Sequence, residues 1–197
     1  EVHALLGENG AVKSTLMKIL GGIYTKDAGS ILINGREVQI HNVADARDNG
    51  ISIIHQELML ARHMTIAENV FMGREQKKAG GFVDLASQDA ATQRFLDHYG
   101  IKLKADTRLD RLTNAQQQMV EIIRALMSNA QVVIMDEPTA ALTERETDRL
   151  FEVMSRRKKQ GVSIIYISHR MEEVFGNCDT ITVMRDGQTI STRPTEE

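Results

Sequence analysis

The sequence has 197 residues, 42% of them hydrophobic, which suits a single soluble globular domain with a sizeable core. Lysine and arginine number 24 against 27 aspartate and glutamate, a net charge of −3, and this balance gives no reason to expect nucleic acid as a partner. The lone cysteine, Cys178, excludes an internal disulfide framework, and no apolar run approaches the roughly 18 residues of a membrane span.

The first quarter of the chain predicts strands, a helix and a hairpin. It begins EVHALL, without Met and already inside an apolar run, so we expect a fragment cut at its N-terminus. Residues 2–6 predict a short buried strand, and STLMKILGG predicts a helix that stops at its glycines. SILINGREVQI predicts a hairpin, because Asn34-Gly35 is a turn signal between two alternating runs, and ISII predicts a further strand.

The rest of the chain is predicted to be helical at first and then to alternate between strands and helices. From about residue 58 to residue 128 the signals are mainly helical. Strands are predicted at 132–136 and 162–168, with a helix at 144–159 between them, and Asp186-Gly187 turns a closing hairpin.

Strands that alternate with helices predict an α/β fold with a mainly parallel sheet, and the helical middle predicts an inserted subdomain. We assign residues 1–57 and 129–197 to the core and residues 58–128 to the helical subdomain.

The stretch GENGAVKST, residues 7–15, nearly matches a phosphate-binding loop. That motif is Gly, four residues, Gly, Lys and then Ser or Thr; Gly7, Lys13 and Ser14 stand at the required spacing, but Val12 replaces the second glycine. The predicted nucleotide-binding residues are Gly7, Glu8, Asn9, Gly10, Ala11, Val12, Lys13, Ser14 and Thr15.

A loop between a strand and a helix presents backbone N–H groups and the positive end of the helix dipole to a phosphate. Lys13 would reach the β- and γ-phosphates of ATP, and the Ser14 hydroxyl would hold Mg²⁺. The loop by itself also fits an ordinary Gly-rich turn with a surface lysine.

The run VVIMDEPTAAL, residues 132–142, contains two acidic residues, Asp136 and Glu137. Asp136 ends an apolar strand, beside the phosphate loop if the two strands are neighbours, and could hold Mg²⁺ through water. Glu137 points to a different side and could polarise the water that attacks the γ-phosphate. An Asp-Glu pair alone is more often a solvated turn or a helix cap, but together with the loop it predicts a nucleotide site.

Several stretches along the chain carry a specific resemblance. They are GENGAVKSTLMKILGGIY, IIHQELML, TIAENVFMGRE, QQQMVEIIRAL, IMDEPTAALTERE, YISHRMEEVF and CDTITVMRDGQ. In this order they resemble the nucleotide-binding subunit of an ABC transporter, and most closely the first ATPase half of bacterial ribose-, galactose- and xylose-type sugar importers. The resemblance implies a P-loop NTPase core of the ABC ATPase type, with an antiparallel hairpin portion and the helical subdomain.

The resemblance assigns two further catalytic residues. Gln56 matches the Q-loop glutamine, which touches Mg²⁺ or the attacking water, and His169 matches the switch histidine, which donates to the γ-phosphate in the transition state. Catalysis would then rest on Glu137, His169, Gln56 and Lys13, and the metal on Ser14, Gln56 and Asp136. Ser168 could alternatively cap the helix that follows it.

LTNAQ, residues 112–116, stands where the family has its signature, Leu-Ser-Gly-Gly-Gln. Thr113 and Gln116 predict a capping box at a helix start, which leaves a helix N-terminus to face the γ-phosphate of ATP bound to the opposite half. Asn114 and Ala115 replace the two glycines, and Thr143 replaces the aspartate that normally ends the D-loop. A well-capped helix without a nucleotide contact is the alternative.

The resemblance implies an ATPase that powers import of a monosaccharide, with ATP and Mg²⁺ bound at the cytoplasmic face of the bacterial inner membrane. Its partners would be a second ATPase half, transmembrane permease subunits and, indirectly, a periplasmic sugar-binding protein. The aromatic residue that stacks on adenine in the family is expected upstream of residue 1. The alternatives are a nucleotide-binding module that has lost hydrolysis and a soluble ABC-fold ATPase of DNA repair or translation.

Val12 is the one departure within the loop that bears on affinity. Loops of this kind commonly need positive φ, where a β-branched residue costs about 1–2 kcal/mol, and its methyl groups would occupy space near phosphate oxygens. We therefore predict that this chain binds MgATP more weakly than a Val12→Gly variant.

Overall fold

The computed structural model describes residues 1–7, 11–54 and 58–196, and of residues 11 and 12 the backbone alone. The chain divides into two compact units, which are Glu1–Gln56 with Asn129–Pro138 and Met154–Glu197, and Glu57–Ser128 with Thr139–Val153. Residues 139–153 therefore group with the helices, whereas the sequence prediction assigned them to the core. One reason is that Arg149 donates a hydrogen bond to the carbonyl oxygen of Gly100, which ties this segment to the helical unit.

The first unit is built on a sheet in which the order of the described strands is β4-β5-β6-β1-β7-β8. Every neighbouring pair is parallel except β7 and β8, which form an antiparallel hairpin. The strands are β1 (Val2–Gly7), β4 (Ile51–Ile54), β5 (Val132–Asp136), β6 (Ser163–Ile167), β7 (Thr180–Arg185) and β8 (Gln188–Pro194). The mainly parallel sheet confirms the α/β fold class expected from the sequence.

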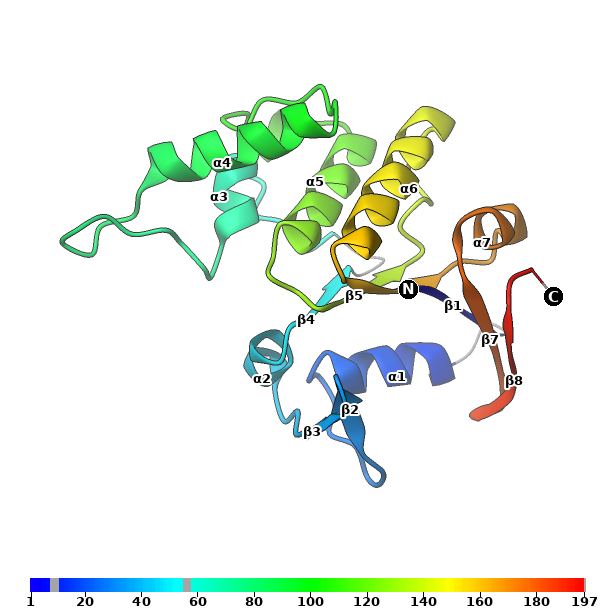
Figure 1. Cartoon of the computed structure of the whole chain (residues 1–197). Helices are drawn as coiled ribbons and strands as arrows, with labels where there is room; N and C mark the ends of the chain where they lie inside the picture. Colours follow the sequence, from blue (N-terminus) through cyan, green and yellow to red (C-terminus); the bar gives the residue numbers. More distant parts are fainter. Residues whose placement is uncertain (8–10, 55–57, 197) are drawn as a thin grey trace. The chain divides into compact units, whose positions relative to one another are not determined.

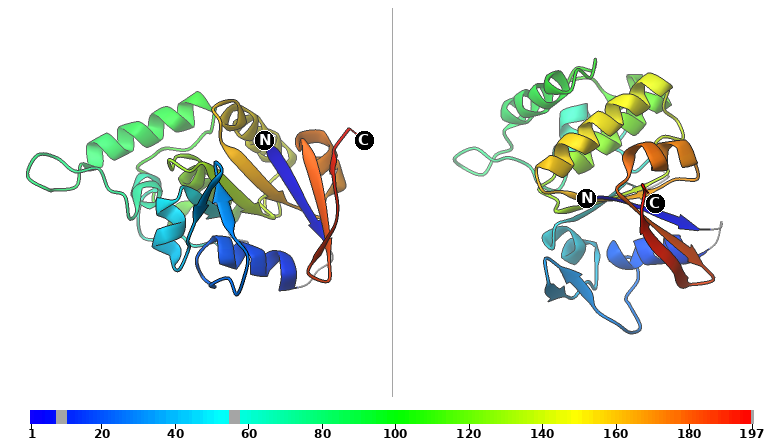
Figure 2. Two further views of the ribbon diagram at one scale, coloured as in Figure 1. Left: turned by 60° about the horizontal axis from the view of Figure 1, so that its bottom comes forward. Right: turned by 45° about the vertical axis from the view of Figure 1, so that its right-hand side comes forward.

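Helices cover both faces of this sheet. Helix α1 (Ala11–Leu20) lies along one face and α7 (Met171–Asn177) lies on the other (Figures 1 and 2). The α1 side forms a core in which Met17 packs with strand residues that include Leu5 and Ile134. Tyr166 of β6 faces the opposite way and hydrogen-bonds to α7, as the alternation of side chains along a strand requires.

Two hairpins turn where the sequence predicts them. The small hairpin of β2 (Ile31–Ile33) and β3 (Arg36–Val38) reverses at Asn34 and Gly35, whose φ angles are 51° and 74°. The β7–β8 hairpin reverses at Asp186 and Gly187, with φ angles of 49° and 83°. Positive φ at both central residues is the requirement that selects Asn-Gly and Asp-Gly in such turns. Helix α2 (Val43–Asp48) follows the first hairpin and precedes β4.

The second unit is helical. It holds α3 (Ile66–Phe71), α4 (Leu85–His98), the short 3-10 helix η1 (Leu109–Arg111), α5 (Asn114–Leu126) and the first part of α6 (Glu144–Lys159). Helix α3 packs against both α4 and α5. Each of the three helices has buried apolar side chains, among them Val70 of α3, Leu96 of α4 and Ile123 of α5. Across the helices of the described ranges, none has the length and apolar character needed to cross a membrane.

Arg74 joins the ends of two of these helices. Its guanidinium donates to the carbonyl oxygens of Val70 in α3 and of Arg124 and Met127 at the end of α5, at 2.7–3.1 Å. The last carbonyls of a helix have no partner inside the helix, so a half-buried cation that reaches two helix ends satisfies several of them at once.

Candidate functional site

Three of the predicted site residues in the first unit lie at or just after the carboxyl ends of its parallel strands. Gly7 ends β1, Asp136 ends β5, and His169 follows β6, so all three lie at one edge of the sheet. Strand β6 lies between β1 and β5. The sequence interpretation put Asp136 beside the phosphate loop if β1 and β5 were direct neighbours, and they are not. At about 4.8 Å per strand, Asp136 lies two strand positions, roughly 10 Å, from the axis of β1.

Gly7 is required by the sheet as well as by the loop that follows it. It pairs with Met184 of β7, and a Cβ at Gly7 would stand 2.6 Å from the carbonyl oxygen of Met184. The ammonium of Lys13 donates to the carbonyl oxygen of Gly7 at 2.5 Å, so this lysine lies over the end of β1. The strand end and the cation predicted to bind phosphate are therefore in direct contact.

The other loop residues are distributed as follows. Ser14 is exposed and Thr15 is half-buried on α1, directly after Lys13. Predictions at Glu8, Asn9, Gly10 and Gln56 fall outside the described residues.

The helix α1 begins at Ala11 and includes Val12. Helical residues have negative φ, so the backbone cost predicted for a β-branched residue at Val12 does not arise in this structure. That part of the prediction is wrong because the helix starts earlier than the loop pattern suggested. The N–H of Val12 belongs to the first turn of α1, where N–H groups have no intrahelical partner.

Glu137 and His169 form a pair at the same edge. The Nδ1 atom of His169 lies 2.9 Å from Oε1 of Glu137. The Glu137 side chain is 19% exposed and that of His169 is 79% exposed, so the carboxylate lies inward and the imidazole outward. Because a carboxylate accepts, Nδ1 carries the hydrogen in this pair, and Nε2 becomes a second donor when the ring is protonated.

The backbone of Glu137 is in the left-handed region, with φ of 49°. Its N–H donates to the carbonyl oxygen of Ile167 in β6 at 2.9 Å, which holds the peptide against the neighbouring strand. Positive φ in a residue with a long side chain is uncommon, and such residues cluster at functional sites because the surrounding structure must hold them in place. The sequence gives no signal for this conformation.

Glu173 is the positioning residue that the sequence interpretation missed. It is buried on α7, and its carboxylate accepts from the hydroxyl of Tyr166 at 2.6 Å, from Ser168 at 3.2 Å and from Arg170 at 2.7 Å. The hydrogen bond from Arg170 to Glu173 raises the pKa of that guanidinium above its ordinary value. Ser168 and Arg170 flank His169, so Glu173 fixes the chain on both sides of the histidine. A glutamate four residues after a histidine at a helix start was the available signal.

Ser168 does not cap α7 in the way considered from the sequence. The helix begins at Met171, and its N-cap residue is Arg170. The Ser168 hydroxyl accepts instead from the N–H of Arg170 at 3.1 Å and donates to Glu173.

In the second unit, the structure confirms the predicted capping box at the start of α5. The hydroxyl of Thr113 accepts from the N–H of Gln116 at 3.3 Å, and the Gln116 side-chain oxygen accepts from the N–H of Thr113 at 3.0 Å. Asn114 and Ala115 form the first turn of the helix. Thr143 precedes α6, and the Glu146 carboxylate accepts from its N–H at 2.9 Å and its hydroxyl at 2.8 Å.

A divalent cation at the sheet edge would need ligands from the nucleotide. Asp136 supplies a carboxylate at the end of β5, and Ser14 supplies a hydroxyl near the start of α1. Among residues 1–7, 11–54 and 58–196, no group of three or more His, Cys, Asp or Glu is placed to hold a metal. This donor set fits Mg²⁺, which protein sites hold through one or two oxygen ligands while phosphates and water supply the rest.

The ABC transporter family model matches residues 1–140 of this chain. The chain belongs to the ABC transporter family. Its fold agrees with that assignment: the ADP conformation of an ATP-binding cassette of an ABC transporter superposes with a TM-score of 0.80 at 27% identity, covering 100% of this chain and 82% of that one. A nucleotide-free cassette gives a TM-score of 0.81 at 25% identity over 98% of this chain and 80% of its own.

Curated members of the family are also similar in sequence. A ribose import ATP-binding protein of Bacillus subtilis is 52% identical over 98% of this chain, and one of Caldanaerobacter subterraneus is 54% identical over 96%. A putative ribose/galactose/methyl galactoside import ATP-binding protein of Albidiferax ferrireducens is 51% identical over 98%. This ABC chain spans 38–39% of the length of these relatives.

Proposed function

We propose that this chain binds MgATP at the carboxyl edge of its sheet and hydrolyses it to ADP and phosphate. The observation that carries the proposal is the Glu137–His169 pair, which places a carboxylate and an imidazole at the edge that Lys13 and Asp136 share. These are the groups needed to orient water and to stabilise charge on a transferred phosphoryl group.

Each residue has a distinct task in this proposal. Lys13 and the first-turn N–H groups of α1 hold the β- and γ-phosphates. Glu137 accepts a hydrogen bond from the attacking water, and protonated His169 donates from Nε2 to a γ-phosphate oxygen. Ser14 and Asp136 hold Mg²⁺, which neutralises phosphate charge when bound. Gln56 contacts the metal or the water.

The wider role proposed for the chain is to power import of a sugar. The names of the similar ribose and galactoside import proteins support this substrate class. In that role the chain acts at the cytoplasmic face of the bacterial inner membrane with a second ATPase half, permease subunits and, indirectly, a periplasmic sugar-binding protein. Thr113, Asn114, Ala115 and Gln116 face ATP on the opposite half.

The test separates binding from turnover. We expect Lys13→Ala to weaken binding of a fluorescent MgATP analogue by at least about tenfold, because a charge-assisted contact to phosphate is lost. Glu137→Gln should keep binding within about threefold while phosphate release falls by about a hundredfold or more. Unchanged binding in Lys13→Ala would contradict the site. Binding without phosphate release, in the unsubstituted chain combined with its second ATPase half, would identify a nucleotide module that has lost hydrolysis.

We also propose that Val12 lowers the affinity for MgATP through its side-chain volume. Its N–H lies in the first turn of α1, where bound phosphate oxygens approach the backbone closely. Val12→Gly should bind the same analogue about tenfold more tightly, although glycine is a slightly poorer helix former. Equal affinities in two variants with the same circular dichroism spectrum would show that the loop tolerates valine.

A further inference from the structure

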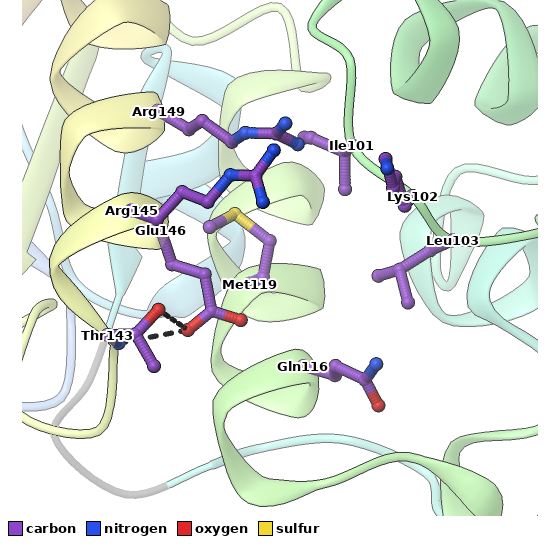
Figure 3. Close-up of a pocket in the computed structure, with 9 residues that line it drawn as sticks. All are labelled: Ile101, Lys102, Leu103, Gln116, Met119, Thr143, Arg145, Glu146 and Arg149. Atoms are coloured by element: carbon purple, nitrogen blue, oxygen red, sulfur yellow. Dashed lines mark hydrogen bonds between the residues drawn. The ribbon is translucent and has the colours of Figure 1, made fainter.

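The second unit contains a cavity of about 220 Å³ that the proposed ATP chemistry does not use. It lies where the chain after α4 meets the first turns of α5 and α6 (Figure 3). All of its lining residues belong to the second unit. This volume is smaller than the pockets of about 300 Å³ or more that hold drug-sized ligands, so it suits a smaller molecule.

One side of the cavity is strongly cationic. Arg145 and Arg149 stand one turn apart on α6, and both line the cavity (Figure 3). Lys102 lies across the cavity from them, on the chain after α4. Arg149 uses part of its guanidinium to donate to Gly100, whereas the heads of Arg145 and Lys102 contact no hydrogen-bond or ion-pair partner within the described ranges.

The lining offers little negative charge to balance these groups. Glu146 is its one carboxylate among the described residues, and that group already accepts both hydrogen bonds from Thr143. The starts of α5 and α6 add the positive ends of two helix dipoles. An anion within reach of both guanidinium groups would gain charge-assisted hydrogen bonds from them.

Apolar side chains form another part of the lining. The side chains of Ile101 and Met119 are buried, and Leu103 completes this surface. Gln116 lines the cavity too; its oxygen is held by Thr113, so its NH₂ group is the one that remains to donate to a ligand. Two guanidinium groups beside an apolar surface suit a molecule with an anionic head and a compact apolar body.

We propose that this cavity binds a small organic anion that carries one phosphate or carboxylate group. Arg145 and Arg149 hold the anionic head, Lys102 adds a third positive charge, and the body packs on Met119 and Leu103. Because Gln116 also closes the capping box of α5, an occupant of the cavity fixes the start of that helix. The residues that line the cavity and the residues of the phosphate loop belong to different units of the chain.

The experiment is an NMR titration of the chain with three compounds. They are phenyl phosphate, phenyl acetate as an uncharged control that keeps the phenyl ring, and inorganic phosphate as a control that lacks the ring. Benzoate tests whether a carboxylate replaces the phosphate head. We expect saturable shifts at Met119 and at residues 101–103 with phenyl phosphate, with a dissociation constant below about 1 mM, and at least about tenfold weaker binding of inorganic phosphate. Phenyl acetate should cause no saturable shift there. Absence of saturation by both phenyl phosphate and benzoate up to about 20 mM would overturn the proposal.

Variants assign the site. Arg145→Gln should weaken binding by about tenfold, whereas Arg94→Gln, at an exposed arginine of α4 outside the cavity, should leave it within about twofold. Lys13→Gln should also leave these shifts unchanged, which separates this site from the proposed ATP site. If Arg145→Gln does not fold, Lys102→Gln takes its place with the same expectation. Shifts that persist unchanged in a folded variant, or that follow protein concentration without any ligand, would contradict a small-anion site.

Discussion

At the scale of single residues, the site depends on backbone positions that side-chain chemistry alone does not explain. Glu137 adopts φ of 49°, donates its N–H to Ile167 and directs its carboxylate to His169. A left-handed glutamate is costly, by about 1–3 kcal/mol, so the neighbouring strand and the histidine must hold it. The geometry of this pair is therefore supplied by β5 and β6 together.

Gly7 gives the sharpest test of backbone packing. We expect Gly7→Ala to lower the free energy of unfolding by about 2 kcal/mol, because the new methyl group would stand 2.6 Å from the Met184 carbonyl oxygen. Gly176→Ala is the matched control: Gly176 lies in α7 with open space around its Cβ position, and alanine favours a helix. Urea denaturation measures both. Equal stability of the two variants would show that β1 and β7 separate easily.

Cys178 gives a prediction for pH. Burial raises the pKa of this thiol from 9.0 to about 12. The folded chain should therefore react with iodoacetamide at pH 8 about a thousandfold more slowly than the urea-unfolded chain, since each pKa unit lowers the thiolate fraction tenfold. The unfolded chain releases this proton first, so the contribution to stability is present below about pH 9 and is lost as the pH rises toward 12. A Cys178→Ser variant should lack that alkaline loss, and comparable alkylation rates in folded and unfolded chains would contradict the burial.

At the scale of elements, local sequence signals were reliable where a single residue type meets a backbone requirement. Asn34-Gly35 and Asp186-Gly187 turn as predicted because they accept positive φ, and Thr113 with Gln116 forms its capping box because both partners lie within one turn. The position of β6 between β1 and β5 was not predictable, because strand order depends on contacts between distant segments. Glu173 was missed although its partners Tyr166, Ser168 and Arg170 lie within seven residues of it, because its spacing from His169 was not interpreted as a positioning contact.

Arg74 carries the prediction for the helical unit. Arg74→Gln should lower the free energy of unfolding by about 2 kcal/mol or more, because it leaves the carbonyl oxygens of Val70, Arg124 and Met127 without their charged donor. Chemical denaturation followed by circular dichroism measures the change. Arg94→Gln removes an exposed arginine from α4 and should change stability by less than about 0.5 kcal/mol. If both variants behaved alike, the Arg74 contacts would add nothing to stability.

At the scale of the whole molecule, the two units should respond differently to nucleotide. Lys13, Asp136, Glu137 and His169 all lie in the first unit. Bound MgATP should therefore slow hydrogen exchange in α1 and at the ends of β5 and β6, while α4 exchanges as before. Mass spectrometry of peptides from the labelled chain resolves these segments, and Lys13→Ala is the control that should lose the protection. Slower exchange confined to α4 would be inconsistent with the proposed site.

Strand β1 lies in the interior of the sheet, although it contains the first residues of the sequence. Its two partners, β6 and β7, lie at residues 163–167 and 180–185. During synthesis, β1 therefore leaves the ribosome long before either neighbouring strand has been made. Its apolar face must be shielded in the meantime by α1 or by chaperones, because an unpaired strand of this kind readily joins a wrong partner. We therefore expect the rate of translation, as well as the amino-acid sequence, to affect the fraction of this chain that forms the native sheet.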